Sequence, residues 1–179
     1  MNLASLLEQH PKERPALISR GRRTTFGELQ GQVARLRGGL QRLGVEPGDR
    51  VAIVANNNWY FVVSYLAILG VGAVAVPLNP QAPTLAMGHE LSNVGAVGAI
   101  VGPSAREQIA ELDHSDLPAL RHRIGAGFTP GDGIDLDALM VGDPVPLVER
   151  SEDDLAVLVF TSGTAGAPVP RCSPTGTCW

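Results

Sequence analysis

The sequence predicts an α/β fold, a mostly parallel sheet flanked by helices. Two observations lead to this prediction. From residue 50 to residue 101, short β-branched segments alternate with segments of helical period, and strands that alternate with helices form parallel sheets covered on both faces. Hydrophobic residues make up 44% of the 179-residue chain and charged residues 18%, which is typical of a globular chain with a buried sheet.

The first part of the chain is expected to hold a short helix, a hairpin and a long helix. The N-terminal ten residues form an amphipathic pattern interrupted by Glu8, which does not match a secretory signal. Arg20-Gly21 marks the turn of the hairpin, Thr25 is the expected N-cap of the long helix, and Gly44 its C′ residue. The hairpin strands are predicted at 16–19 and 22–25, and the long helix at 26–43.

The middle of the chain contains no Asp, Glu, Lys or Arg between Arg50 and Glu90. The stretch 59–78 is long enough to cross a bilayer, and a membrane span is the alternative interpretation. Gly70 and Pro77 interrupt it, which favours a buried helix followed by a buried strand. The expected strands are 51–54, 73–76 and 97–101, and the expected helices are about 59–69, 83–93 and 104–112.

The segment 113–148 is rich in proline and glycine, which break every period. We expect a surface connection with room for two short strands, one near 120–124. His114 lies between Asp113 and Asp116; in such a segment these side chains are interpreted as solvated rather than as a metal site.

Charge and cysteine content exclude some classes of function. The formal net charge is −4 and no basic stripe with interleaved aromatics occurs, so nucleic acid is not an expected partner. The cysteines are Cys172 and Cys178, and their spacing does not match common zinc knuckles. A reduced, cytoplasmic setting without metal is therefore expected.

The richest local signal is a loop after the apolar segment 155–160, which is predicted to be a buried strand. Glycines let several backbone N–H groups point inward and hydroxyls add donors, so the loop suits a polyphosphate such as that of ATP. An ordinary strand-to-turn junction is the alternative. The predicted ATP-binding residues are Thr161, Ser162, Gly163, Thr164, Ala165 and Gly166.

Four blocks occur in one order along the chain, at 24–29, 44–53, 69–80 and 153–164. Together they resemble the N-terminal part of the large domain of the adenylate-forming (AMP-binding, acyl-CoA synthetase-like) superfamily. The resemblance implies an enzyme that joins ATP and a carboxylic acid into an acyl-adenylate, with Mg²⁺, and then transfers the acyl group to a thiol such as coenzyme A. It also implies that the six loop residues bind the leaving pyrophosphate and that none of them is catalytic.

The chain departs from the family pattern at Ala165, where a second threonine is usual, and at Val169, where a lysine is usual. Valine cannot place a cation beside phosphates. The later family blocks are missing from the sequence. We therefore expect residues 1–168 to be a truncated N-terminal AMP-binding domain of an acyl-CoA ligase, with fatty acids as the preferred substrate class, and inactive by itself.

Residues 169–179 have no counterpart in the family. One permitted choice of codons for them, read two bases later, encodes a stretch that the family carries just beyond this loop, so we hypothesise a frameshift near Val169. Two alternatives remain open. One is a non-catalytic nucleotide-loop or association module that pairs with a full-length relative, and the other is a remnant of a degraded gene. Homo- or hetero-association through exposed sheet edges is expected in either case.

Overall fold

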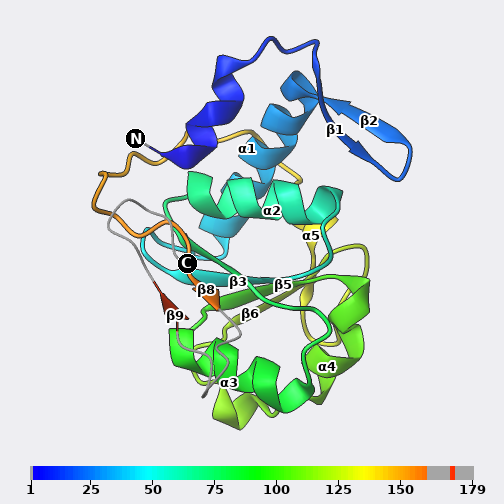
Figure 1. The fold of residues 1–179 in the computed structure, drawn as a ribbon, viewed down its shortest axis with the longest axis vertical. Coiled ribbons are helices and arrows are strands. Elements are labelled where there is room, and N and C mark those ends of the chain that lie inside the picture. Colours follow the sequence, from blue (N-terminus) through cyan, green and yellow to red (C-terminus); the bar gives the residue numbers. More distant parts are fainter. Residues whose placement is uncertain (1, 161–169, 172–179) are drawn as a thin grey trace.

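The computed structural model describes residues 2–160 and 170–171. Figure 1 shows a central sheet with helices on both sides and a hairpin that extends from one end of the molecule. The elements, in chain order, are η1 (Leu3–Gln9), β1 (Pro15–Ser19), β2 (Arg22–Thr25), α1 (Phe26–Arg42), β3 (Arg50–Val54), α2 (Trp59–Gly70), β4 (Val74–Pro77), α3 (Thr84–Val94), β5 (Gly98–Val101), η2 (Pro103–Ala105), α4 (Arg106–Glu111), η3 (His114–Asp116), β6 (His122–Gly125), β7 (Ile134–Asp135), α5 (Leu136–Leu139), β8 (Val159–Phe160) and β9 (Pro170–Arg171).

The main sheet has the strand order β4-β3-β5-β6-β7, and every neighbouring pair in it is parallel. The chain runs from β3 outward to β4 and then crosses back to β5, so the strand order reverses between β3 and β5. In open parallel sheets such a switch point, at the carboxyl ends of the strands, is where ligands usually bind. The predicted α/β class with a mostly parallel sheet is confirmed.

Alternate residues of each strand feed two separate cores, as the pleat of a strand requires. Val51 and Ile53 of β3 lie in the core beneath α1 and α2, while Ala52 and Val54 lie in the core beneath α3 and α4. All four side chains are fully buried. Because both faces of the strands are covered, their sequences are continuous apolar runs.

Helix α1 begins as its sequence predicts. The Thr25 hydroxyl accepts a hydrogen bond from Glu28 N at 3.3 Å, and the Glu28 carboxylate accepts one from Thr25 N at 2.7 Å. This reciprocal arrangement is a capping box. At the other end Gly44 has φ +77°, which glycine adopts without strain and which ends the helix.

The hairpin turn takes left-handed backbone at both central positions, with φ +49° at Arg20 and +80° at Gly21. Left-handed conformation at both central residues is typical of the two-residue turns that suit the twist of a hairpin. The hairpin expected from Arg20-Gly21 is confirmed, with β1 and β2 antiparallel.

The long uncharged stretch forms α2 and β4, joined at Gly72, rather than one continuous helix. Among the described residues, we find no helix with both the length and the hydrophobicity needed to cross a membrane. The alternative of a single span over 59–78 is therefore not what the chain adopts.

Three elements differ from the prediction. The N-terminal helix is a 3₁₀ helix, and the helix expected at 104–112 is divided into η2 and α4. The segment 155–160 is not one regular strand: it makes a single parallel bridge, between Val157 and Ala75, followed by β8. Pro77 in β4 has no N–H to donate. The pairing between β4 and the segment 155–160 therefore does not continue past the bridge at Ala75.

Candidate functional site

The segment 155–160 leads toward the predicted loop. Ala75 N donates to Ala156 O at 2.9 Å, and Leu158 N donates to Ala75 O at 3.0 Å. Val157 and Leu158 are each 7% exposed. Because the bridge is parallel, this segment advances in the same direction as β4. Phe160, the residue before the loop, is thus directed toward the carboxyl edge of the sheet, where open α/β sheets bind ligands.

The loop itself lies outside the described residues. The position of the loop and its contacts with phosphate therefore stay predictions. Val169, Cys172 and Cys178 also lie outside the described residues. The predicted ATP-binding residues concerned are Thr161, Ser162, Gly163, Thr164, Ala165 and Gly166.

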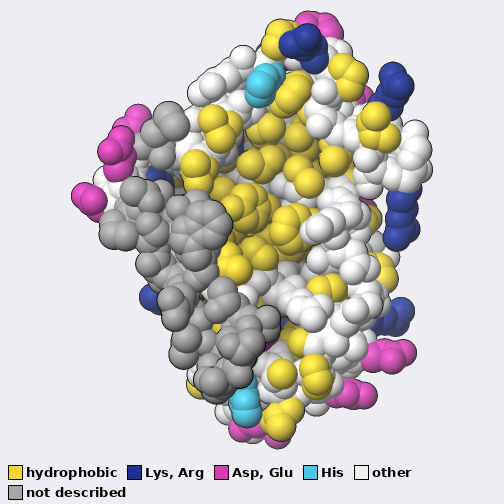
Figure 2. All heavy atoms as spheres, in the orientation of Figure 1, with side chains coloured by type: hydrophobic (Ala, Val, Ile, Leu, Met, Phe, Trp, Pro, Cys, Tyr) yellow, Lys and Arg dark blue, Asp and Glu magenta, His cyan; other side chains and the backbone are white. Residues whose placement is uncertain are grey.

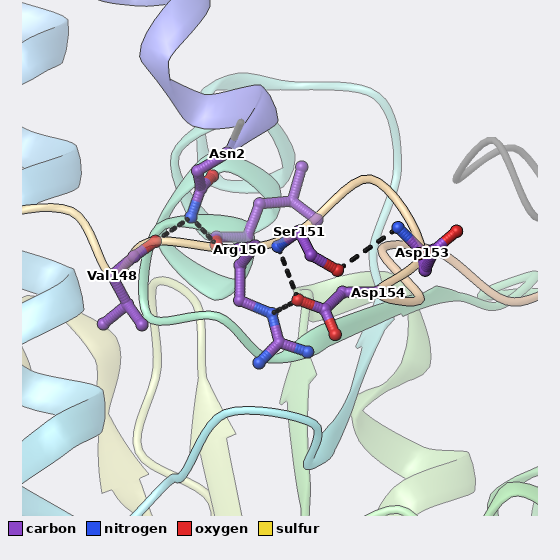
Figure 3. Close-up of polar contacts among 7 residues, drawn as sticks. Asn2, Val148, Arg150, Ser151, Asp153 and Asp154 are labelled. Carbon is purple, nitrogen blue, oxygen red and sulfur yellow. Dashed lines mark hydrogen bonds and ion pairs between the residues drawn. The ribbon is translucent and has the colours of Figure 1, made fainter.

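A closed turn precedes the bridge (Figure 3). Arg150 Nε lies 3.2 Å from Asp154 Oδ2, and the same oxygen accepts a hydrogen bond from Ser151 N at 2.7 Å. Asp153 N donates to Ser151 Oγ at 3.3 Å. Glu152 and Asp153 are exposed. Residues 151–154 form a turn, and the Asp154 carboxylate holds its shape through Arg150 and Ser151.

The side chain of Asn2 links the segment before this turn to helix α2 (Figure 3). Its amide Nδ2 donates to Leu69 O at 2.7 Å and to Val148 O at 2.9 Å, while its Oδ1 accepts from Ala4 N at 2.9 Å. The side chain is 8% exposed. Val148 N also donates to Gly70 O at 2.9 Å. Buried polar groups normally have hydrogen-bond partners of this kind. These bonds hold Val148 on α2 and so fix the segment that leads to the Val157–Ala75 bridge.

Two arginines of α1 bind backbone carbonyls of residues 139–145, which precede this segment. Arg37 is 5% exposed, and its guanidinium donates twice to Val145 O, with Nε at 3.0 Å. Burial lowers the pKa of Arg37 from its ordinary value. Arg42 Nη2 donates to Leu139 O at 3.0 Å and to Val141 O at 2.7 Å. Both side chains therefore position backbone, and neither faces the carboxyl edge of the sheet as a free cation.

The switch point between β3 and β5 is closely packed. Gly102 N donates to Val54 O at 2.9 Å, and a Cβ on Gly102 would lie 3.0 Å from Ala55 Cβ. Beyond this contact Asn56 and Asn57 are exposed, and Asn58 Oδ1 accepts from Phe61 N at 3.2 Å and caps α2. The edge offers amide donors and acceptors to a ligand.

Tyr60 forms a second polar feature at this edge, one that sequence analysis missed. Its phenol hydrogen-bonds Asp137, whose backbone N donates to Asp135 Oδ1 at 2.8 Å. Burial, followed by the neighbouring acids, raises the pKa of Tyr60, and burial together with Asp135 raises the pKa of Asp137. The phenol thus remains protonated at neutral pH and donates to Asp137.

The side chain of His114 lies outside the described part of the structure, and its neighbour Asp113 takes part in a local turn. Asp113 Oδ1 accepts from Ser115 N at 2.9 Å and from Ser115 Oγ at 2.8 Å, which is local turn bonding. In residues 2–160 and 170–171 there is no group of three His, Cys, Asp or Glu side chains that could hold a metal ion. Burial lowers the pKa of His122, which packs beside Arg121 and hydrogen-bonds the backbone of Leu43.

A profile of the family described as AMP-binding enzyme matches residues 4–168. The chain belongs to this family. The sequence is 36% identical over 175 residues to a propanoyl:CoA ligase of Mycobacterium tuberculosis whose acid carries a methyl-dioxo-octahydroindenyl ring system, covering 92% of this chain and 34% of that ligase. It is 36% identical over 148 residues to a feruloyl-CoA synthase of Amycolatopsis, covering 83% and 28%.

The fold agrees with this assignment. The crystal structure of an anthranilate CoA ligase in complex with anthranoyl-AMP superposes with a TM-score of 0.89 at 23% identity, covering 96% of this chain and 35% of the ligase. The chain spans about a third of the length of the curated relatives it matches. The resemblance to the AMP-binding family, and to its N-terminal portion, is confirmed.

Proposed function

We propose that the chain is the N-terminal portion of an ATP-dependent acyl-CoA synthetase. Such an enzyme forms an acyl-adenylate from ATP and a carboxylic acid and then makes a thioester with coenzyme A. The observation that supports this most is the parallel bridge between Ala75 and Val157. It directs the last described residues before the hydroxyl-rich loop to the edge of the sheet that suits a nucleotide.

In this proposal the loop binds the β- and γ-phosphates. Gly163 and Gly166 permit close approach of backbone N–H groups, and Thr161, Ser162 and Thr164 add hydroxyl donors. This donor set fits a polyphosphate. Mg²⁺ would offset the charge of the phosphates when bound, but in the part of the chain that the structure describes no three acidic side chains converge to hold it.

The 179 residues alone are proposed not to catalyse adenylation, because they span about a third of the related ligases and carry Val169 in the loop. A pyrophosphate-release assay with ATP, Mg²⁺ and a panel of acids should stay at background. The panel should contain fatty acids, the substrate class expected from the sequence, and ring-bearing acids. Clear turnover by the 179-residue chain would contradict the proposal of inactivity.

Nucleotide binding tests the loop separately from turnover. We expect ATP to bind weakly, in calorimetry or by fluorescence, and Ser162→Ala together with Gly163→Val to weaken binding at least tenfold. Ser151→Ala is the matched control, since Ser151 lies in the exposed turn before the bridge. Equal ATP binding by the loop variant and the control would refute phosphate binding by the loop.

A cytoplasmic location of the protein also remains a prediction.

The second candidate is a non-catalytic module that associates with another AMP-binding enzyme. The observation that favours it is the uncharged outer side of α2. This module would retain a partial nucleotide loop, so its test is association: capture of a full-length relative by the tagged 179-residue chain supports it, and no capture contradicts it.

A further inference from the structure

Arg37 carries a buried charge. Figure 2 shows Lys and Arg side chains toward the rim of the molecule, where water surrounds them, and hydrophobic side chains gathered at the centre of this side. Arg37 is only 5% exposed, and the acceptor of its hydrogen bonds is the neutral carbonyl of Val145. It takes part in none of the ion pairs formed within residues 2–160 and 170–171. Charges that are buried in proteins are normally paired with an opposite charge.

Part of the guanidinium of Arg37 has no acceptor. Its Nε and Nη2 both donate to Val145 O, whereas Nη1 donates to no group in the described part of the chain. Burial lowers the pKa of Arg37 and the charge of Glu8 raises it, but Glu8 is exposed and lies beyond ion-pair distance. A guanidinium stays charged at neutral pH. Arg37 therefore keeps both a charge and N–H donors with which it can bind an anion.

Arg37 lines a pocket between η1 and α1, two helices that lie together at the end of the molecule that carries the hairpin (Figure 1). The pocket has a volume of about 290 Å³, the space of about ten water molecules. Gln30 Nε2 donates to Leu7 O at 2.6 Å and so holds η1 on α1. The apolar part of the wall includes Leu7, Val33, Pro144 and Leu147. The charged side chains of the wall are Glu8, Lys12 and Arg37. Apolar walls with a few polar groups are typical of sites for small molecules.

Two glycines of α1 provide the space. Gly27 and Gly31 are four residues apart, which places them on one face of the helix, and both line the pocket. The atom nearest to a Cβ at Gly31 is Arg35 Nη1, at 3.8 Å. Glycine inside a helix weakens it relative to alanine, and no close packing at Gly31 requires a glycine. Its effect in the structure is to leave the pocket open.

The charges of the pocket indicate the class of its ligand. Arg37 and Lys12 are cations and Glu8 is an anion, so one positive charge is left over and a monoanion would balance it. The planar donors of a guanidinium match a carboxylate, and the apolar wall suits an organic body. We propose that this pocket binds a small organic carboxylate through Arg37 and Lys12. Its walls come from η1, α1 and connecting segments and not from the carboxyl edge of the sheet, so the inference goes beyond the proposed adenylation and does not depend on it.

Ligand-detected NMR on the 179-residue chain tests the proposal, with benzoate as the probe. Benzamide, a neutral molecule of nearly the same shape, is the matched control ligand, and inorganic phosphate is an anion without an apolar part. We expect benzoate to bind with a dissociation constant of about 1 mM or less, and each control ligand to bind about tenfold more weakly or not at all. No binding of benzoate, or equal binding of benzamide or phosphate, would overturn the proposal.

Variants locate the site. Arg37→Met should weaken benzoate binding about tenfold or more, because it removes the charged donors. Gly31→Leu retains Arg37 but fills the pocket, and it should have the same effect in a chain that circular dichroism shows to be folded. Glu8→Gln removes the competing negative charge and should tighten binding about threefold. Arg106→Met is the matched control, because Arg106 is exposed on α4, and it should bind benzoate as the native chain does.

Benzoate binding that both Arg37→Met and Gly31→Leu leave intact would overturn the proposal, and so would weaker binding by Glu8→Gln. The variant with Ser162→Ala and Gly163→Val, which tests the nucleotide loop, should bind benzoate like the native chain. Loss of benzoate binding in that variant would place the ligand at the loop and would contradict a separate site. Failure of ATP binding and failure of benzoate binding are thus distinguishable.

Discussion

Substituting Gly39 by alanine should destabilise the chain, although alanine is the better helix former. Gly39 lies in α1, where the intrinsic gain from glycine to alanine is about 1 kcal/mol. A Cβ at Gly39 would lie 2.4 Å from Leu139 O and 2.8 Å from Leu139 Cβ. Atoms cannot approach that closely, so α5 must move away from α1.

The size of the effect follows from the contacts that this movement disturbs. Overpacking of a buried contact costs about 1–3 kcal/mol. Moving Leu139 also weakens its carbonyl hydrogen bond from Arg42, and a hydrogen bond to a charged group contributes about 1.5–3 kcal/mol. After subtracting the gain in helix propensity, we expect Gly39→Ala to lower the free energy of unfolding by about 2 kcal/mol.

Gly31→Ala is the matched control in the same helix. The nearest atom to a Cβ there is Arg35 Nη1, at 3.8 Å, so the substitution should stabilise the chain by about 1 kcal/mol. Urea unfolding followed by circular dichroism measures both. With a slope of about 2 kcal/mol per molar urea, the midpoint should fall by roughly 1 M for Gly39→Ala and rise for Gly31→Ala. A rise for both variants would refute the close α1–α5 contact.

Three further predictions concern single side chains. Arg37→Met should lower the free energy of unfolding by about 2 kcal/mol, since it removes the buried guanidinium that donates to the half-buried Val145 carbonyl. The exposed Arg35→Met should change it by less than about 0.5 kcal/mol, and equal urea midpoints would contradict the Arg37–Val145 contact. Thr25→Ala removes the capping box and should cost about 1 kcal/mol in the same assay. Burial raises the pKa of Glu90, whose Oε2 is buried without a partner. The folded state then binds the proton more tightly than the unfolded state, so stability falls as pH rises through this window. Glu90→Gln should have a higher Tm than the native chain at pH 7 and the same Tm below the ordinary pKa of glutamate; a gap that persists in acid would contradict this origin.

The fold was predictable because its signals are local. The capping box at Thr25 and Glu28, the left-handed position at Gly44 and the change from helical to strand period near Gly72 are each visible in a few consecutive residues. Even the strands that are buried on both faces can be identified in the sequence as uninterrupted apolar runs. The family blocks then identified the N-terminal portion of an AMP-binding enzyme.

What escaped prediction depends on residues far apart in the sequence. The burial of Arg37 is one example, because a charged residue is normally exposed. It is four residues after Val33 and three before Leu40, which are both buried, and that spacing was the available signal. The Tyr60–Asp137 pair had none, because only the sheet brings the two together. The 155–160 strand was predicted from composition, but its length depends on Pro77 in another strand.

The Asn2 contact has a consequence for folding during synthesis. Its amide bonds Val148 O across a sequence separation of 146 residues, so this bond cannot form until nearly all of the described chain has been synthesised. Contacts of such long range form late and slow the folding of a domain. The bond from Asn2 to Leu69 O and the packing of η1 on α2 involve residues 2–70 alone. The segment around Val148 is therefore the part that is fastened last, and it is fastened to a side chain that was made first.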